Sequence, residues 1–257
     1  MNATTDGTAL GTPPTRERIV LWGGIAAITT LAWIYLLRAP MPSMSAMAMA
    51  AMPMAHQWSI GDALLTFIMW AVMMVAMMMP SATPMLSMYE RVASTRENSR
   101  AHRVWIFAAG YLAVWTAFSL VATALQFALQ QSAIISDDLK ATPIAAGIIL
   151  AVAGIYQLTP LKNICLARCR TPVSFFMLNW RDGSVGAFYL GLKHGTLCMG
   201  CCWMLMALLF VAGVMNLAWV AAISALVLIE KAAPRGGTIA TVSGVLMIAA
   251  GVVVAIR

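Results

Sequence analysis

The sequence predicts an all-α protein, a polytopic integral membrane bundle of about seven transmembrane helices with its N-terminus inside. Of the 257 residues, 61% are apolar and only 10% are charged, and the mean hydropathy is +0.84. Soluble domains average about 45–50% apolar and about 25% charged residues. A soluble globule of this composition could not coat its surface with charge. Two further observations, the length of the apolar stretches and the placement of the basic residues, give the helix count and the orientation.

The apolar residues fall in seven stretches, each close to the roughly 20 residues that a helix needs to cross a bilayer. Helix is the default for such segments because the hydrocarbon offers backbone groups no water to bond. The turn between the fifth and sixth stretches lies near 201–203 or near 213–216, and the sequence does not decide between them. The predicted helices run over 19–37, 60–79, 104–129, 142–158, 185–202, 205–229 and 238–256.

The basic residues set the predicted orientation. Lys and Arg concentrate on the cytoplasmic side of bacterial membranes. With the N-terminus inside, twelve basic residues lie on the inner side and three, Arg38, Lys140 and Arg257, lie outside. The sixteenth, Lys193, falls within a predicted helix. We therefore expect a multi-pass protein of the bacterial inner (plasma) membrane with a cytoplasmic N-terminus and an external C-terminus.

The predicted organisation is a disordered cytoplasmic segment, 1–18, followed by a single transmembrane helical domain, 19–257, with a Met-rich outer loop at 38–59. The first apolar stretch is too long for the usual 7–15-residue core of a cleaved signal peptide, which is the alternative interpretation. The basic residues are scattered and form no single patch, so no nucleic-acid partner is expected. The expected partners are the lipid bilayer, a metal ion and a membrane or periplasmic protein.

A methionine-rich tract occupies the outer loop. Six of the 21 methionines fall between 41 and 54, and the candidate ligands are Met47, Met49, Met52, Met54 and His56. Thioether sulfur is a soft ligand that suits Cu(I) and forms no disulfides in an oxidising compartment. The alternative is a low-complexity linker, because Met is also a flexible apolar filler.

The predicted second helix carries further methionines at helical spacing. Met69, Met73 and Met77 share one face at i, i+4 and i+8, and Met74 and Met78 form an adjacent row. Such a face could pass a soft ion along the helix, with Met73, Met77 and Met78 as candidate ligands. Adaptable packing against neighbouring helices is the alternative.

Two prolines follow this methionine face. Pro80 and Pro84 are expected to break the helix close to the inner face, because proline removes a helical hydrogen bond. The segment 77–85 is therefore predicted to be an irregular element, which a membrane tolerates only where protein or a cavity surrounds it.

The predicted fifth helix carries the densest chemistry. His194, Cys198 and Cys202 stand at i, i+4 and i+8 and share a face, Cys201 borders it, and Met206 lies one turn further. These side chains together suit Cu(I) or another thiophilic ion. Free cysteine also fills buried space. The pattern of two vicinal cysteines, a third one turn earlier and a histidine before it nevertheless favours a metal or redox role.

A second pair of thiols, Cys165 and Cys169, has i, i+4 spacing on a short inner-side helix among basic residues. Thiols stay reduced in the cytosol, so the pair suits a metal relay better than a stable disulfide. Anchoring of the helix at the membrane surface through its arginines is the alternative, and the two roles are compatible.

Lys193 is the remaining candidate site residue. It lies nine residues into the fifth helix, at a depth of about 14 Å. An ionisable residue near the bilayer centre is a functional hypothesis by default and needs a partner. A thiolate from Cys198 or Cys202 is the expected partner.

Several phrases of the sequence resemble a bacterial family of unknown function described as predicted metal-binding integral membrane proteins. The resemblance spans about 62–231 and implies a membrane location and a metal site; the Met-rich loop is not part of it. The phrases are MMMPSA at 77–82, YQLTPLK at 156–162, CLARCR at 165–170, GCCWMLM at 200–206, VMNL at 214–217 and EK at 230–231.

The predicted function is membrane metal handling, with Cu(I) captured at the outer loop and held by the intramembrane His/Cys cluster. One alternative is a membrane thiol–disulfide oxidoreductase, and another is an accessory or assembly subunit of a membrane metalloenzyme. The sequence shows no phosphate-binding loop, no hydrolase triad and no paired membrane carboxylates. It therefore favours a role other than an enzyme.

Overall fold

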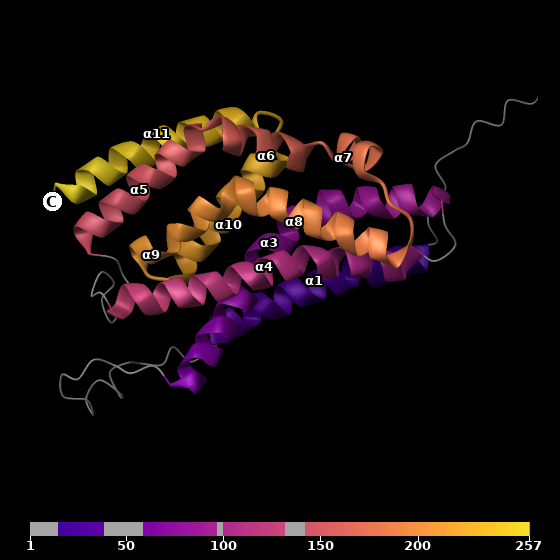
Figure 1. Ribbon diagram of the computed structural model, residues 1–257, viewed down its shortest axis with the longest axis horizontal. Helices are drawn as coiled ribbons and strands as arrows, with labels where there is room; N and C mark the ends of the chain where they lie inside the picture. Colours follow the sequence, from indigo (N-terminus) through magenta and orange to yellow (C-terminus); the bar gives the residue numbers. More distant parts are fainter. Residues whose placement is uncertain (1–14, 39–58, 97–99, 132–141, 257) are drawn as a thin grey trace, which may run out of the picture.

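The computed structural model describes residues 15–38, 59–96, 100–131 and 142–256, and these are helical apart from short turns. Figure 1 shows an elongated bundle whose long helices run along a common direction. The candidate ligands Met47, Met49, Met52, Met54 and His56 lie outside the described residues. The helices are α1 (Thr15–Arg38), α3 (Ile60–Arg96), α4 (Arg100–Gln131), α5 (Pro143–Leu158), α6 (Pro160–Arg170), α7 (Pro172–Asn179), α8 (Gly183–Ala207), α9 (Leu209–Ala212), α10 (Leu217–Ala232) and α11 (Gly236–Ala255).

Five helical segments are long and apolar enough to cross a membrane: α1, α3, α4, α8 continued by α9, and α11. The pair α5 and α6 passes the same test only together, and the two helices are bent by 63°. Helix α10 has 16 residues and a length of about 24 Å, less than the roughly 30 Å of hydrocarbon. The fold is therefore all-helical and compatible with membrane insertion. Two of the seven predicted crossings, α5 and α10, are short.

The turn between the predicted fifth and sixth helices lies at 213–216, the second of the two positions considered. Gly213 has a positive φ of 96°, which favours glycine. The Asn216 side chain then caps α10 by accepting from the backbone N–H of Trp219 at 3.2 Å. Helix α8 therefore continues through Cys202 to Ala207 and carries Met206 on the same helix.

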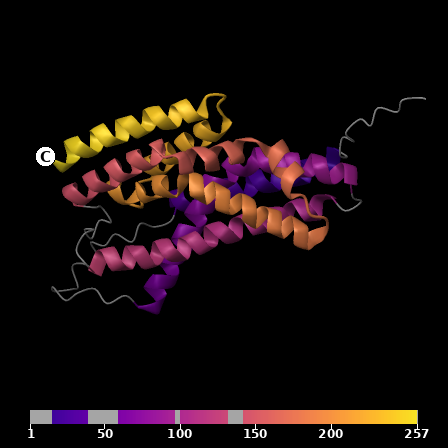
Figure 2. The ribbon, with the colours of Figure 1, turned by 45° about the horizontal axis from the view of Figure 1, so that its top comes forward.

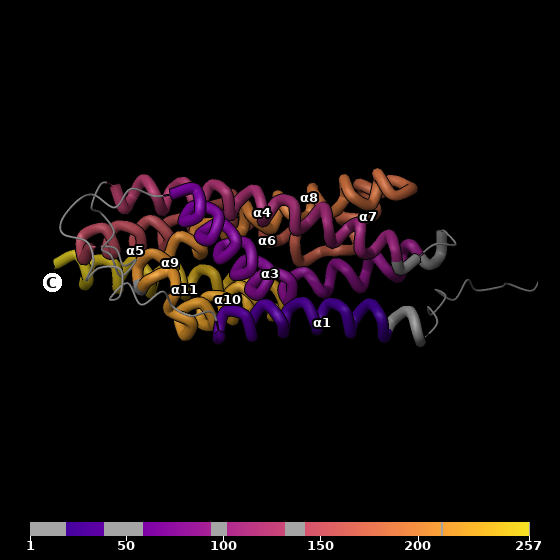
Figure 3. Tube along the Cα trace, turned by 90° about the horizontal axis from the view of Figure 1, so that it is seen from below, coloured from indigo at the N-terminus to yellow at the C-terminus, as the bar shows by residue number. Residues whose placement is uncertain are grey.

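The predicted break at the prolines is wrong, because α3 continues as one helix through Pro80 and Pro84. Each proline deprives the carbonyl four residues earlier of its helical donor. The indole of Trp33 in α1 donates to the carbonyl of Ala76 at 3.2 Å, and the Thr83 hydroxyl donates to that of Pro80 at 2.7 Å. Figure 3 shows that α3 changes direction along its length while remaining helical.

Helices α4 and α8 approach closely at two glycines. A Cβ added to Gly110 would lie 2.3 Å from the Phe188 carbonyl oxygen, and one added to Gly191 would lie 2.1 Å from that of Phe107. Small residues allow this approach between membrane helices. The contact fixes α8, which carries three of the five cysteines, against α4.

Helices α5 and α11 pair in the same way and lie side by side in Figures 1 and 2. The contacts are reciprocal and antiparallel. A Cβ on Gly154 would lie 2.5 Å from the Gly244 carbonyl oxygen, and one on Gly147 would lie 2.7 Å from that of Gly251. Four glycines at matching seven-residue spacings therefore bring the two backbones into contact.

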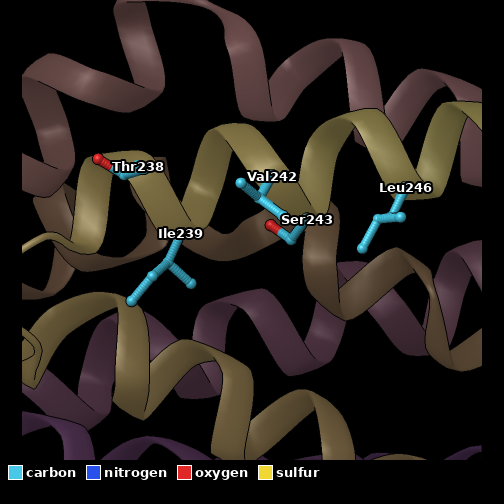
Figure 4. A pocket seen from close by; sticks show the side chains of 5 residues that line it. All are labelled: Thr238, Ile239, Val242, Ser243 and Leu246. Atoms are coloured by element: carbon cyan, nitrogen blue, oxygen red, sulfur yellow. The ribbon is translucent and has the colours of Figure 1, made fainter.

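The outer face of α11 is apolar, as expected of a surface toward lipid. A depression of about 240 Å³ lies along this helix, and Figure 4 shows the side chains that line it. Val242 and Leu246, which line it, are more than half exposed. The depression is lined by Thr238, Ile239, Val242, Ser243 and Leu246.

Candidate metal centre

The structure brings the two predicted sets of cysteines to one place. Cys198, Cys201 and Cys202 on α8 are each no more than 2% exposed. The Cys169 thiol of α6 lies close to that of Cys201 on α8. The sulfur of Cys165 lies against α8, 3.0 Å from where a Cβ on Gly200 would sit. All five cysteines carry free thiols. We refer to them as the thiol cluster.

The three thiols of α8 lie within about one turn of helix. The thiols of Cys201 and Cys202 both donate to the carbonyl oxygen of Cys198, at 3.1 and 2.9 Å. Helical spacing therefore directs these side chains toward the same stretch of backbone, as the i, i+3 and i, i+4 positions predict.

Four helices converge on Cys198. The Lys231 ammonium of α10 donates to the Cys198 sulfur at 2.9 Å and to the Ser81 hydroxyl of α3 at 3.0 Å. The Tyr111 hydroxyl of α4 lies 3.1 Å from the same sulfur and donates to the Met78 carbonyl at 3.1 Å. Cys198 therefore contacts a cation and a tyrosine hydroxyl, and the same cation also binds a serine of α3.

The sequence did not reveal Lys231, Tyr111 or Ser81 as members of the site. Lys231 was counted among the basic residues of the inner side, because it closes an apolar stretch beside Glu230. Two adjacent ionisable residues at the end of an apolar helix were the available signal. Tyr111 and Ser81 carry no such signal, since a tyrosine or serine in a membrane helix is common.

Lys193 does not reach the thiols and instead donates to the Asn179 side chain of α7. The cation at Cys198 is Lys231, which lies 33 residues further along the chain.

His194 is buried at the edge of the thiol cluster among aromatic rings. Its ring stacks on Tyr111 at 5.3 Å and on Phe107 at 6.0 Å, and the edge of Phe175 also approaches. The Nδ1 atom has no hydrogen-bond partner within the part of the chain that the structure describes. His194 therefore offers an unsatisfied ring nitrogen next to the tyrosine that contacts Cys198.

The methionine candidates lie in the core. Met73, Met77 and Met78 on α3 and Met206 on α8 are at most 1% exposed. The backbone of Met78 is hydrogen bonded to Tyr111, so the methionine face of α3 passes beside the thiol cluster. Their burial suits both close packing and ion binding.

A second set of charged and polar groups positions the end of α10. Lys162 and Glu230 form an ion pair at 2.6 Å in which both side chains are at most 2% exposed. Gln157 donates to the same carboxylate at 2.7 Å. A buried pair of this kind is costly to break because the remaining charge loses its partner. It joins the junction of α5 and α6 to α10 and holds Lys231, the next residue, toward α8.

The candidate ligands are soft sulfur atoms, and the cysteines among them are free thiols. Among the described residues, no three His, Cys, Asp or Glu side chains stand ready as a preformed metal site. Pairs of thiols do lie together, and a pair of thiolates suffices for Cu(I), which forms linear two-coordinate complexes with sulfur. Thiolate and thioether ligands select Cu(I) over harder ions.

The fold and the site together define a class: a helical protein with several membrane-length helices and a buried thiol cluster beside a lysine. Comparison with known families gives the particular family. Residues 67–254 match the family described as PpoB2, copper chaperone, and this range is well over half of the chain. The chain therefore belongs to this family, and its function is related to copper.

The matched range contains all five cysteines, His194 and Lys231, and it leaves out the Met-rich loop. The family match supports the sequence-based expectation of a metal-related bacterial family. No curated protein and no solved structure matches the chain.

Proposed function

We propose that the protein is a membrane-embedded copper chaperone that holds Cu(I) between cysteines of the thiol cluster and passes it to a partner protein. The observation that carries this proposal is the contact between Cys169 of α6 and Cys201 of α8, which unites thiols from two helices. Cys198, Cys202 and Cys165 lie around this pair, so an ion has several neighbouring sulfurs between which it can move.

Lys231 gives the proposed site a preference for a monovalent ion. Cu(I) held by two thiolates carries a net charge of −1, which the Lys231 ammonium beside Cys198 neutralises. A divalent ion with the same two thiolates is already neutral, and the lysine then adds an unbalanced positive charge. Because the three thiols of α8 are buried, this difference is screened less than it would be in water.

The proposed path of the ion begins at the Met-rich loop, with Met47, Met49, Met52, Met54 and His56 as capture ligands. The next ligands on the proposed path are the buried thioethers that precede the thiols: Met73, Met77 and Met78 of α3 and Met206 of α8. Thiolates bind Cu(I) more tightly than thioethers, so the transfer from the methionines to the thiols is downhill. His194, with its unsatisfied Nδ1, offers a further nitrogen ligand beside Tyr111, which contacts Cys198.

The proposed setting is the bacterial inner membrane with the N-terminus inside and seven crossings, of which α5 and α10 are the short ones. In this orientation the basic residues around α6, α7 and the turn between α10 and α11 face the cytoplasm.

Titration of the full-length protein with Cu(I) tests the proposal. The protein is purified in detergent under anaerobic, reducing conditions and titrated against a competing Cu(I) chelator. We expect stoichiometric binding that is lost in Cys169→Ser/Cys201→Ser and weakened in Cys198→Ser/Cys202→Ser. Thr196→Ser, an exposed change on the same helix, is the matched control and should bind as the parent does.

A different result of this titration would support the alternative function. If Cu(I) does not bind and a disulfide among Cys198, Cys201 and Cys202 forms and reduces reversibly, the thiol–disulfide oxidoreductase replaces the chaperone.

A further inference from the structure

Lys193 and Arg168 line a cavity that is separate from the thiol cluster and that the proposed copper chemistry does not use. The cavity has a volume of about 280 Å³ and lies where α6, α7 and α8 meet. Arg168 comes from α6 and Lys193 from α8, and Asn179 of α7 accepts a hydrogen bond from Lys193. In Figure 1, α7 lies toward the end of the bundle away from the C-terminus.

The lining of the cavity is cationic. It contains two basic side chains and no acidic one. Arg168 is exposed, and Asn179 holds the ammonium of Lys193 in place. The cavity is thus complementary to an anion, and its size fits a small charged group better than a polymer.

The rim of the cavity on α7 is apolar and uncovered. Leu178, which lines the cavity, is 83% exposed, and Met177 beside it is 78% exposed. Val173, one turn earlier, is also exposed. Exposed apolar residues next to a cationic cavity suit a ligand with a charged head and an apolar tail.

We propose that this cavity, which we call the α7 pocket, binds the phosphodiester headgroup of an anionic phospholipid. Basic pockets between membrane helices on the cytoplasmic side hold acidic lipid headgroups, and the apolar face of α7 would lie against the acyl chains. Arg168 adjoins Cys169, so the bound lipid links α6 to α8 beside the thiol cluster. The proposal does not depend on copper.

Lipid binding to the delipidated, full-length protein tests the α7 pocket. The protein is held in a neutral detergent, and thermal unfolding and native mass spectra are recorded with phosphatidylglycerol, with phosphatidylcholine and with inorganic phosphate. We expect phosphatidylglycerol alone to stabilise the protein and to remain bound. In Arg168→Gln/Lys193→Gln its apparent affinity should fall at least tenfold.

Two further variants make the result specific. Arg235→Gln removes an exposed arginine at the turn before α11 and should bind lipid as the parent does. Arg168→Lys/Lys193→Arg keeps both charges and should retain most of the binding. Equal retention of lipid by the parent and the double glutamine variant would overturn the proposal. Equal stabilisation by inorganic phosphate would replace the lipid with a free anion.

Discussion

At the scale of single residues, the contact between the Lys231 ammonium and the Cys198 sulfur sets the charge of the thiol cluster. His194, Cys198 and Cys202 were placed on one face because helical spacing is a property of the sequence itself. The partner of Cys198 was not predictable in this way, because Lys231 lies on another helix and reaches the thiol only through the packing of α10. The nearer lysine, Lys193, was the expected partner and is bonded to Asn179 instead.

Lys231→Met should weaken Cu(I) binding, because the charge of a bis-thiolate complex loses its neutralising partner. We expect a loss of about 1.5–3 kcal/mol, or roughly ten- to a hundredfold in Kd. The affinity for Zn²⁺ should change in the opposite direction. Competition titrations with both metals measure the two effects.

Lys193→Met is the control for this prediction, since it removes a lysine that does not contact the thiols. It should leave the Cu(I) affinity unchanged, and Lys231→Arg should retain more of it than Lys231→Met. Equal affinities in Lys231→Met and the parent would remove the lysine from the site.

At the scale of helices, the length of the apolar stretches predicts most of the helices. Glycine and proline predict the breaks between them with mixed success. Gly213 and Asn216 mark a real turn. Pro80 and Pro84 do not end α3, because side chains from α1 and from α3 itself satisfy the carbonyls that the prolines leave free. A sequence shows that a donor is missing, but it does not show which distant side chain replaces it.

Gly154→Ala should destabilise the pair of α5 and α11. The added Cβ would lie 2.5 Å from the Gly244 carbonyl, so the backbones must separate. Overpacking of this kind costs about 1–3 kcal/mol, and thermal unfolding in detergent should show a lower Tm.

Gly23→Ala provides the comparison, because nothing lies within 4 Å of the Cβ added there. Alanine is the better helix former, so this variant should unfold no earlier than the parent. If the two variants have the same Tm, the close contact between α5 and α11 is not what stabilises the pair.

At the scale of the whole molecule, composition alone indicated a membrane protein, and the helices support that class. Length alone marks five crossings, because α5 is bent against α6 and α10 has only 16 residues. A buried ion pair between Lys162 and Glu230 joins the start of α6 to the C-terminal end of α10.

Reporter fusions test the seven-crossing arrangement. Fusions after residues 95 and 175 should report the cytoplasm, and a fusion after residue 257 should report the outside. Helix α10 decides the last result, since a chain in which α10 does not cross would return its C-terminus to the cytoplasm. A cytoplasmic signal from the fusion after residue 257 would contradict the arrangement.

The ion pair between Lys162 and Glu230 also bears on the order in which the protein is made. Lys162 is synthesised 68 residues before Glu230, the carboxylate that pairs with it. During synthesis α6 therefore carries a charge that has no counterpart. Helix α11, whose glycines close on α5, follows later still. The bundle is therefore completed by its last two helices, which also supply Lys231. We expect a nascent chain to reach its full affinity for Cu(I) only after α10 has been synthesised. Incompletely synthesised chains should therefore bind little copper.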